Sequence, residues 1–448
     1  MSILTAQANR RLVAKLAALG ATVTGISLTA SSAATAQDSP TVVYWLDVTG
    51  GSDTAQWVID NTVAEFNALG GVQVEATMQP NGWTATQTAL AGGAGPDVVV
   101  TPGPSLSMEL GKAGQVMALD DYATEFGWAD SFAPWAMDLG RVNDALIALP
   151  NEVETLVLYY NKTLFEAQGW TPPTTIDEMT ALAQQVADAD IIPFAHTNAE
   201  WKGSNEWFVG EFLNHAAGPD LVYQALTGEI PWTDQAFADA LTILNDYQQN
   251  GWFMGGLDRY YTTPSADATA ALAYGDAAMK IEGSWLISDA NTFFEESGQE
   301  WEWVPMPSTS GEAIFDLGIG STYSINANSE VPDAAAEFLN YLFSPEVQAK
   351  AVTGIGSAAA PVTIPEDLLG DLDPRQARMI EELNAASSAG GYGYTTWTFW
   401  PPKSETYLIE DIERVWAGDL TVEEYLQGLQ DIFVTELEAG DVPPVPAR

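Results

Sequence analysis

The sequence predicts an α/β protein of two domains, and three observations lead to this prediction. From Thr41 onward, short β-rich runs alternate with helical stretches, which is the pattern of α/β layers. Residues 37–448 are too long for one ordinary hydrophobic core and suit two domains, with segments that can interleave. No cysteine occurs, so neither a disulfide framework nor a thiolate metal site can hold the fold together.

The first 36 residues read as an export signal. Arg10, Arg11 and Lys15 form a positive segment, residues 16–28 are mostly apolar or small, and Ala34-Thr35-Ala36 offers a cleavage site. The apolar run is shorter than the ~20 residues that a membrane span needs. We therefore expect a protein exported through a cleaved signal, with a periplasmic location.

The charge balance excludes several classes of partner. Asp and Glu number 61 against 15 Lys and Arg, which gives a net charge of −46. Three of the basic residues leave with the signal. Such an acidic chain does not bind nucleic acid, and it has few cations to pair with a phosphorylated ligand. A neutral ligand is favoured.

Apolar runs bounded by turn residues predict the strands of the sheets. Two of them, ALIALP and TLVLYYN, are separated by a short stretch that carries Glu152 and Glu154. The predicted strands are TVVYWL (41–46), VQVEATM (72–78), GPDVVVTP (95–102), ALIALP (145–150) and TLVLYYN (155–161).

Capping signals and helical spacing predict the helices. Thr175 and Glu178 form a capping box at the start of the helical pattern in 172–189. Pro332 opens a helix through Phe343, and Ser344 with Pro345 starts the next. The tail 407–437 has the pattern of an amphipathic helix, and PPVP (443–446) is expected to be a frayed end.

Four stretches together resemble one known family. They are GPDVVV (95–100), LPNEVETLVLYYNKTLFEAQG (149–169), PPTTIDEMTALA (172–183) and GDAAMKIEGSW (275–285). Their order and spacing resemble the family 1 extracellular solute-binding proteins, the maltose-binding-protein-like class that serves sugar ABC importers. One departure is Val142-Asn143-Asp144-Ala145, which stands where that family usually has a Gly-Lys turn.

The resemblance implies a two-lobed periplasmic-binding-protein fold. Each lobe would be a mixed sheet flanked by helices, and the crossovers are expected at 150–155, 317–322 and 358–363. The implied domains are a signal peptide 1–36, an N-terminal lobe of 37–151 and 321–360, and a C-terminal lobe of 152–320 and 361–448. Ligands of such folds bind beyond the carboxyl ends of the strands, and binding closes the hinge.

A sugar ring offers apolar faces and a rim of hydroxyls, so its site needs flat aromatic rings and hydrogen-bonding groups. The resemblance implies that Trp285 stacks on sugar and that Glu154 accepts sugar hydroxyls, with Glu152 a weaker candidate. The C-terminal aromatic cluster 390–400 supplies another stacking ring, for which Trp397 is preferred over Trp400. A buried core Trp and a solvated acid are the competing interpretations.

Further candidates come from polar and aromatic residues at predicted loops. Asn205 and Trp207 lie in a stretch, 201–207, that interleaves aromatic and polar groups and is expected to form a loop at the cleft. Asp47 follows the first strand, where a helix cap is the alternative role. Gly320, with Gly318, would let the backbone approach the ligand, unless a hinge turn alone requires it. Trp83 is expected to be a loop aromatic.

A secreted glycoside hydrolase with paired carboxylates is the enzymatic alternative, because it too would be rich in Trp and acids. No nucleophile elbow or glycine-rich phosphate loop occurs, and the histidines are only His196 and His215. We therefore expect no enzyme activity, no cofactor and no metal site. The expected partners are a neutral mono- or oligosaccharide or related polyol and the transmembrane subunits of an ABC permease, through which alone the monomer would meet the membrane.

Overall fold

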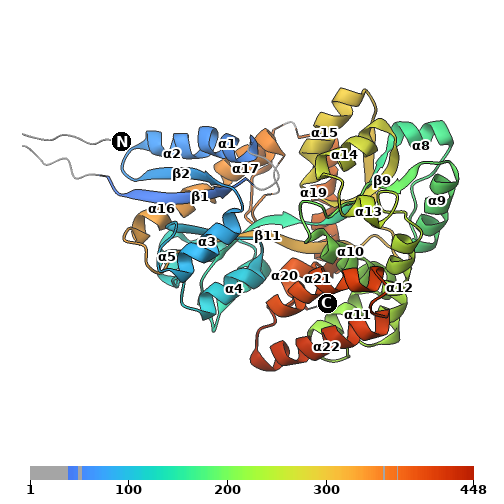
Figure 1. Cartoon of the computed structure of the whole chain (residues 1–448). Helices are drawn as coiled ribbons and strands as arrows, with labels where there is room; N and C mark the ends of the chain where they lie inside the picture. Colours follow the sequence, from blue (N-terminus) through green and yellow to red (C-terminus); the bar gives the residue numbers. More distant parts are fainter. Residues whose placement is uncertain (1–38, 49–52, 357–358, 371, 448) are drawn as a thin grey trace, which may run out of the picture. The chain divides into compact units, whose positions relative to one another are not determined.

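The computed structural model describes residues 39–48, 53–356, 359–370 and 372–447 (Figure 1). The predicted signal peptide, residues 1–36, lies outside the described residues. Within the ranges described, we find no helix that is long and apolar enough to cross a membrane.

Strands and helices alternate along the chain, as the sequence predicts. The strands are β1 (Thr41–Asp47), β2 (Gln73–Gln79), β3 (Val98–Thr101), β4 (Arg141–Val142), β5 (Ala145–Leu146), β6 (Leu149–Glu154), β7 (Leu156–Asn161), β8 (Ile192–Phe194), β9 (Ala277–Gly283), β10 (Trp301–Pro305), β11 (Phe315–Ile325) and β12 (Tyr392–Tyr394).

The helices begin with α1 (Asp53–Val58), which continues through the π-helical turn η1 (Ile59–Val63) into α2 (Ala64–Leu69). The others up to β9 are α3 (Gly82–Ala91), α4 (Pro104–Lys112), α5 (Asp120–Phe126), α6 (Trp128–Ser131), α7 (Pro134–Leu139), α8 (Lys162–Gln168), α9 (Ile176–Asp188), α10 (Ser204–Phe212), η2 (Leu213–Ala217, π-helical), α11 (Pro219–Leu226), α12 (Gln235–Gln249), α13 (Leu257–Tyr260) and α14 (Ser265–Tyr274). After β9 come α15 (Leu286–Ser297), α16 (Pro332–Leu342), α17 (Pro345–Ile355), α18 (Glu366–Leu369), α19 (Pro374–Ala389), α20 (Thr396–Phe399), α21 (Pro402–Trp416) and α22 (Val422–Ala439).

The first sheet is six-stranded and mixed, in the order β12-β11-β3-β1-β2, with β6 also paired to β11. Strands β1, β2 and β3 run parallel, whereas β11 runs antiparallel to β3. On one face, Tyr44 of β1 packs against Phe338 of α16, with ring centroids 5.6 Å apart. On the other face, Val99 of β3 shares a smaller core with Leu90 of α3 and Met108 of α4. Helices therefore cover both faces of this sheet.

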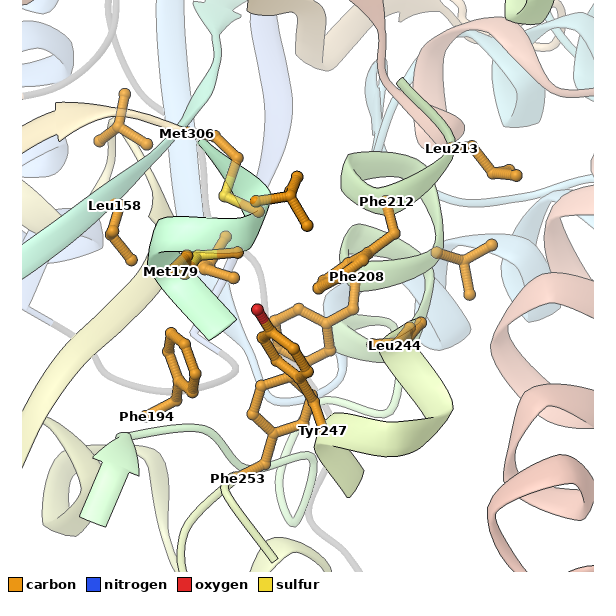
Figure 2. Packing of buried hydrophobic residues seen from close by; sticks show 14 of the residues in the cluster. Leu158, Met179, Phe194, Phe208, Phe212, Leu213, Leu244, Tyr247, Phe253 and Met306 are labelled. Atoms are coloured by element: carbon orange, nitrogen blue, oxygen red, sulfur yellow. The ribbon is translucent and has the colours of Figure 1, made fainter. Parts of the chain in front are cut away.

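The second sheet has four strands in the order β10-β7-β9-β8, and it is also mixed. Its core is the larger one, and it draws aromatic residues from β8, α10, α12 and the loop before α13. Figure 2 shows Phe194, Phe208, Tyr247 and Phe253 pointing toward one another in this core. Phe208 and Phe253 are stacked with centroids 5.0 Å apart. Two mixed sheets, each covered by helices and packed on its own core, are the α/β arrangement that the sequence predicts.

Three chain segments run side by side where the sequence analysis places the crossovers. Residues 149–154 of β6 pair antiparallel with residues 318–323 of β11. The Val153 amide, in turn, donates a hydrogen bond of 2.8 Å to the Ala359 carbonyl. Strand β11 pairs with β12 at its start and with β3 at its end. Strand β11 thus pairs with three strands that come from distant parts of the chain.

Local signals located most of the predicted helices correctly. The Thr175 hydroxyl accepts from the Glu178 amide, and the Glu178 carboxylate accepts from the Thr175 amide, so the capping box of α9 is confirmed. Helices α16 and α17 begin at Pro332 and Pro345, as predicted.

Several local predictions are wrong. Glu152 and Glu154 do not lie between strands, because the pairing with β11 extends β6 through Glu154. The tail 407–437 is two helices, separated at Gly418 in a left-handed conformation with φ 79°. The PPVP end is held in place, since the Tyr394 hydroxyl donates to the Pro446 carbonyl at 2.9 Å.

The crossover strand β6 carries a strained residue. Glu152 has φ 60°, in the left-handed region that costs a non-glycine residue roughly 1–2 kcal/mol. Its carboxylate accepts a hydrogen bond of 2.7 Å from the Ser321 hydroxyl of β11. Glu152 lies between Asn151 and Val153, which pair with Ser321 and Ile319, so the strain lies in the middle of the β6–β11 pairing.

We expect Glu152→Gly to be more stable than Glu152→Ala by about 1 kcal/mol, because glycine adopts this conformation without a Cβ clash. Both variants lose the hydrogen bond from Ser321, so their comparison isolates the backbone strain. Urea unfolding followed by tryptophan fluorescence measures the difference. Equal stability of the two variants, or a more stable Glu152→Ala, would show that the strain is absent in solution.

Candidate functional site

Several of the predicted site residues meet at the middle of β11, where two glycines leave room for them. A Cβ built on Gly320 would lie 2.4 Å from the carboxylate of Glu154. A Cβ on Gly318 would lie 3.0 Å from the Trp397 ring and 3.3 Å from the Glu154 carbonyl. The close approach of these groups therefore requires glycine at 320, and Gly318 is tightly enclosed.

Three tryptophans from three helical segments form a continuous cluster. Trp285, at the start of α15, lies 5.1 Å from Trp207 of α10 and 6.1 Å from Trp397 of α20, measured between ring centroids. The planes are inclined by 56° and 69°, so neither pair is stacked face to face. Trp207 and Trp285 are partly exposed. Such rings can offer flat apolar surface to a ligand.

The orientation of Trp285 is set by a charged partner on β9. Its indole Nε1 donates to the Glu282 carboxylate at 3.1 Å, and that carboxylate also forms an ion pair of 3.3 Å with Lys280. Glu282 and Lys280 are both buried. Glu282 therefore holds the Trp285 ring through its indole N–H and does not stack on the ring.

Trp397 carries an unused hydrogen-bond donor. The residue is 7% exposed, and its indole Nε1 has no hydrogen-bond partner among the described residues. An unsatisfied buried N–H is costly, of the order of 1–3 kcal/mol. It is therefore a donor available to a ligand that reaches the cluster.

The Glu154 carboxyl is unusual because it is largely removed from water. It is 9% exposed, and burial, reinforced by the negative charge of Glu152, raises its pKa well above the usual value for glutamate. A raised pKa favours the protonated form, which can donate as well as accept a hydrogen bond. Glu154 thus offers hydrogen bonds to hydroxyl groups without a buried negative charge.

Helix α4, which follows β3 and packs on the first sheet, contacts the same cluster. The Ser105 hydroxyl donates to the Glu405 carboxylate of α21 at 2.6 Å and lies 3.5 Å from the Trp397 carbonyl. Gly103, with φ 88°, allows this approach, because a Cβ there would lie 2.6 Å from the Trp397 carbonyl oxygen. Helices α4 and α21 therefore meet beside Trp397.

Glu405 and Glu206 are buried acids beside this contact. Burial raises the pKa of Glu405 to about 8, the hydrogen bond from Ser105 opposes the shift, and Glu109 and Glu436 add to it. Burial and the nearby Glu405 likewise raise the pKa of Glu206. Neutral carboxyls at this position avoid the cost of buried negative charge.

The segment 201–207 is not a loop throughout, because α10 begins at Ser204. Trp207 joins the tryptophan cluster, but Asn205 is fully buried in a different network. Its amide donates to the Ile409 carbonyl at 2.9 Å and to Glu413 at 3.0 Å, and its oxygen accepts from Tyr260 at 2.6 Å. These bonds occupy the groups that a ligand would use.

The remaining candidates lie at three different places. Asp47 is the exposed last residue of β1, against the start of α3 at Gly82. Trp83 is not a loop residue, because it lies in α3 and is partly buried against the core that contains Val99. Trp400 is fully buried and packs on Trp232 with centroids 5.2 Å apart, which is consistent with the preference for Trp397.

Sequence reasoning missed Glu282, Ser105 and Glu405. Glu282 lies three residues before Trp285 within GDAAMKIEGSW, so its proximity was a usable signal. Ser105 and Glu405 are 300 positions apart, and neither has a distinctive local pattern.

Comparison with known families decides what kind of protein carries this site. A model of bacterial extracellular solute-binding proteins matches residues 61–367. The chain belongs to this family. The membership confirms the resemblance given by the four sequence stretches, and it confirms the prediction of a binding protein rather than an enzyme.

The sequence similarity to individual relatives extends over much of this solute-binding protein. A "Probable sugar-binding periplasmic protein" of Brucella suis biovar 1 (strain 1330) is 23% identical over 442 residues, covering 93% of this chain and 97% of the relative. The "Alpha-glucosides-binding periplasmic protein AglE" of Rhizobium meliloti (strain 1021) is 24% identical and covers 66% and 68%.

Solved structures share the fold. A structure described as "Chitin oligosaccharide binding protein" has a TM-score of 0.76 at 20% identity and covers 90% of this chain and 100% of its own. The GacH receptor of Streptomyces glaucescens has a TM-score of 0.73 at 20% identity, covering 89% and 99%. This likeness confirms the predicted periplasmic-binding-protein fold.

The raised pKa of Glu405 predicts a specific pH dependence of stability. A carboxyl whose pKa is higher in the folded state stabilises the fold fully below its unfolded pKa of about 4.3, and this contribution is lost as the pH rises through about 8. Glu405→Gln keeps an acceptor for Ser105 but cannot ionise. We expect its melting temperature, relative to the parent protein, to rise between about pH 5 and pH 9. A pH-independent difference would contradict the assignment.

Proposed function

We propose that this solute-binding protein captures a neutral mono- or oligosaccharide on the cluster of Trp207, Trp285 and Trp397. Glu154 and the Trp397 indole would hydrogen-bond the sugar hydroxyls, and Gly320 would leave room at β11. The observation that carries the proposal is the contiguous, partly exposed tryptophan cluster beside a buried, readily protonated carboxyl. Asn205 is left out, because its amide is already occupied.

The chemistry of the site favours an uncharged ligand. Flat rings match the apolar faces of a sugar, and a neutral carboxyl and an indole N–H match its hydroxyls. The excess of 61 acids over 15 basic residues disfavours anionic ligands. Relatives named as sugar-binding and alpha-glucoside-binding proteins support the same ligand class.

We further propose that ligand binding closes two lobes about the crossover strands β6 and β11. The lobe boundaries are those inferred from the sequence: 37–151 with 321–360, and 152–320 with 361–448. Asp47 would add a contact from the first lobe. A ligand drives closure only by binding the closed state more tightly than the open one. The closed monomer, exported to the periplasm, would then deliver its sugar to the transmembrane subunits of an ABC permease.

A thermal-shift screen tests the ligand class. The panel includes alpha-glucosides, chitin oligosaccharides and polyols, with a phosphorylated form of each hit as the matched control. A ligand at about 100 times its Kd stabilises the fold by ~2.7 kcal/mol, so the melting temperature should rise for a neutral sugar and not for its phosphate. Chromatography should recover the sugar intact. Stabilisation by phosphates alone, or release of monosaccharide, would overturn the proposal.

Truncation of Trp285 tests the site itself. Trp285→Ala removes the central ring of the cluster, and we expect it to weaken binding of the sugar hit by more than ~1 kcal/mol, on the scale of aromatic stacking losses. Isothermal titration calorimetry measures the change. Trp170→Ala is the matched control, since Trp170 packs on Phe165 with centroids 5.7 Å apart outside the cluster. An unchanged affinity in Trp285→Ala would remove this residue from the site.

A further inference from the structure

Three ionisable side chains meet inside the larger core. Glu211 comes from the end of α10, His215 from the π-helical turn η2, and Asp316 from β11. Each is only 1% exposed. Glu211 lies one helical turn after Trp207 on α10, and Asp316 lies two residues before Gly318 on β11. None of the three side chains has a part in the proposed sugar binding.

The histidine ring is oriented by its second nitrogen. His215 Nδ1 lies 3.1 Å from the Met306 carbonyl oxygen, which can only accept, so Nδ1 carries the proton. Figure 2 labels Met306 in the same core. If Nε2 carries no proton, its lone pair faces the carboxylates, as in metal-binding histidines whose other nitrogen donates to a carbonyl.

The distances fit ligands around a shared ion better than they fit hydrogen bonds. His215 Nε2 lies 3.5 Å from Glu211 Oε2 and 3.5 Å from Asp316 Oδ1. These separations exceed the usual 2.7–3.2 Å of N–H···O bonds. Tetrahedral ligands at about 2.1 Å from zinc lie roughly 3.4 Å from each other. One ligand atom from each residue lies within 4.8 Å of the others.

The polar atoms of the cluster lack partners. Both carboxylate oxygens of Glu211, both of Asp316, and Nε2 of His215 have no hydrogen-bond partner among the described residues. Two acids buried side by side away from water must be neutralised, either by a proton or by a bound cation.

The local backbone keeps the centre open. Glu211 and His215 are four residues apart, and η2 is a π-helical turn, a feature that often occurs at functional sites. On the other side, a Cβ on Gly393 of β12 would lie 1.8 Å from Asp316 Oδ1. Any side chain at 393 would displace that carboxylate, so glycine preserves its position.

We propose that Glu211, His215 and Asp316 bind a divalent transition-metal ion of the zinc class. One imidazole and two carboxylates suit zinc or a similar ion, whereas calcium prefers six to eight oxygen ligands. A water molecule or a second carboxylate oxygen completes the coordination. The sequence predicts no metal site, because its two histidines, 19 positions apart, are expected to be surface or core residues. The fold brings the two acidic residues, Glu211 and Asp316, next to His215.

The test uses the full chain, purified without a polyhistidine tag. Mass spectrometry of the metal content should find zinc equimolar with protein. Dialysis against a chelator should lower the melting temperature, and added zinc should restore it. Glu211→Gln and His215→Gln should weaken zinc binding by more than about tenfold and make the melting temperature insensitive to the chelator.

Glu206→Gln is the matched control, because Glu206 is a buried acid on the same helix but outside the cluster. It should bind zinc like the parent. Zinc bound equally by Glu211→Gln would indicate attachment to the acidic surface and would overturn the proposal. So would a metal-free parent that zinc does not stabilise, which would mean that protons alone neutralise the cluster. None of these measurements depends on sugar binding.

Discussion

The antiparallel pairing of β6 with β11 is the constraint on which the rest of the structure depends. It joins residues 149–154 to residues 318–323, and β11 continues from this pairing to β3 in one direction and β12 in the other. A slip of one residue would turn every side chain of β11 to the opposite face. The register therefore decides which groups meet at Gly318 and Gly320, and it places Glu154 over a glycine that has no side chain to exclude it.

The acidic residues of the chain are accommodated in two ways. Most of the 61 acidic residues can be solvated at the surface, where water and salt screen their repulsion. A few are buried, and among these the loss of water raises the pKa of Glu154, Glu206, Glu211 and Glu405. A buried carboxyl must be protonated, paired or bound to a cation. Glu154 is suited to hydrogen-bonding hydroxyl groups, because protonation leaves it neutral.

The sequence reveals contacts between neighbouring residues more readily than contacts between residues that are far apart in the chain. The α9 capping box depends on Thr175 and Glu178, three residues apart, so it was readable from the chain. Trp285 and Glu154 were reached through a family resemblance, whose motifs contain them. The contact of Ser105 with Glu405 depends on the packing of α4 against α21, and no local pattern encodes it. The same holds for Asn205, which reads as a loop residue but is buried by α21 through Ile409 and Glu413.

The alternation of side chains along β11 links the two proposed sites. Residues 316, 318 and 320 point to one face of the strand, because the side-chain period is two. Asp316 meets Glu211 and His215 on that face, Gly318 meets Trp397, and Gly320 meets Glu154. An ion bound at Asp316 would thus tie the start of β11 to α10, the helix that also carries Trp207. The metal would stabilise the frame on which the tryptophans are arranged, without contacting the sugar.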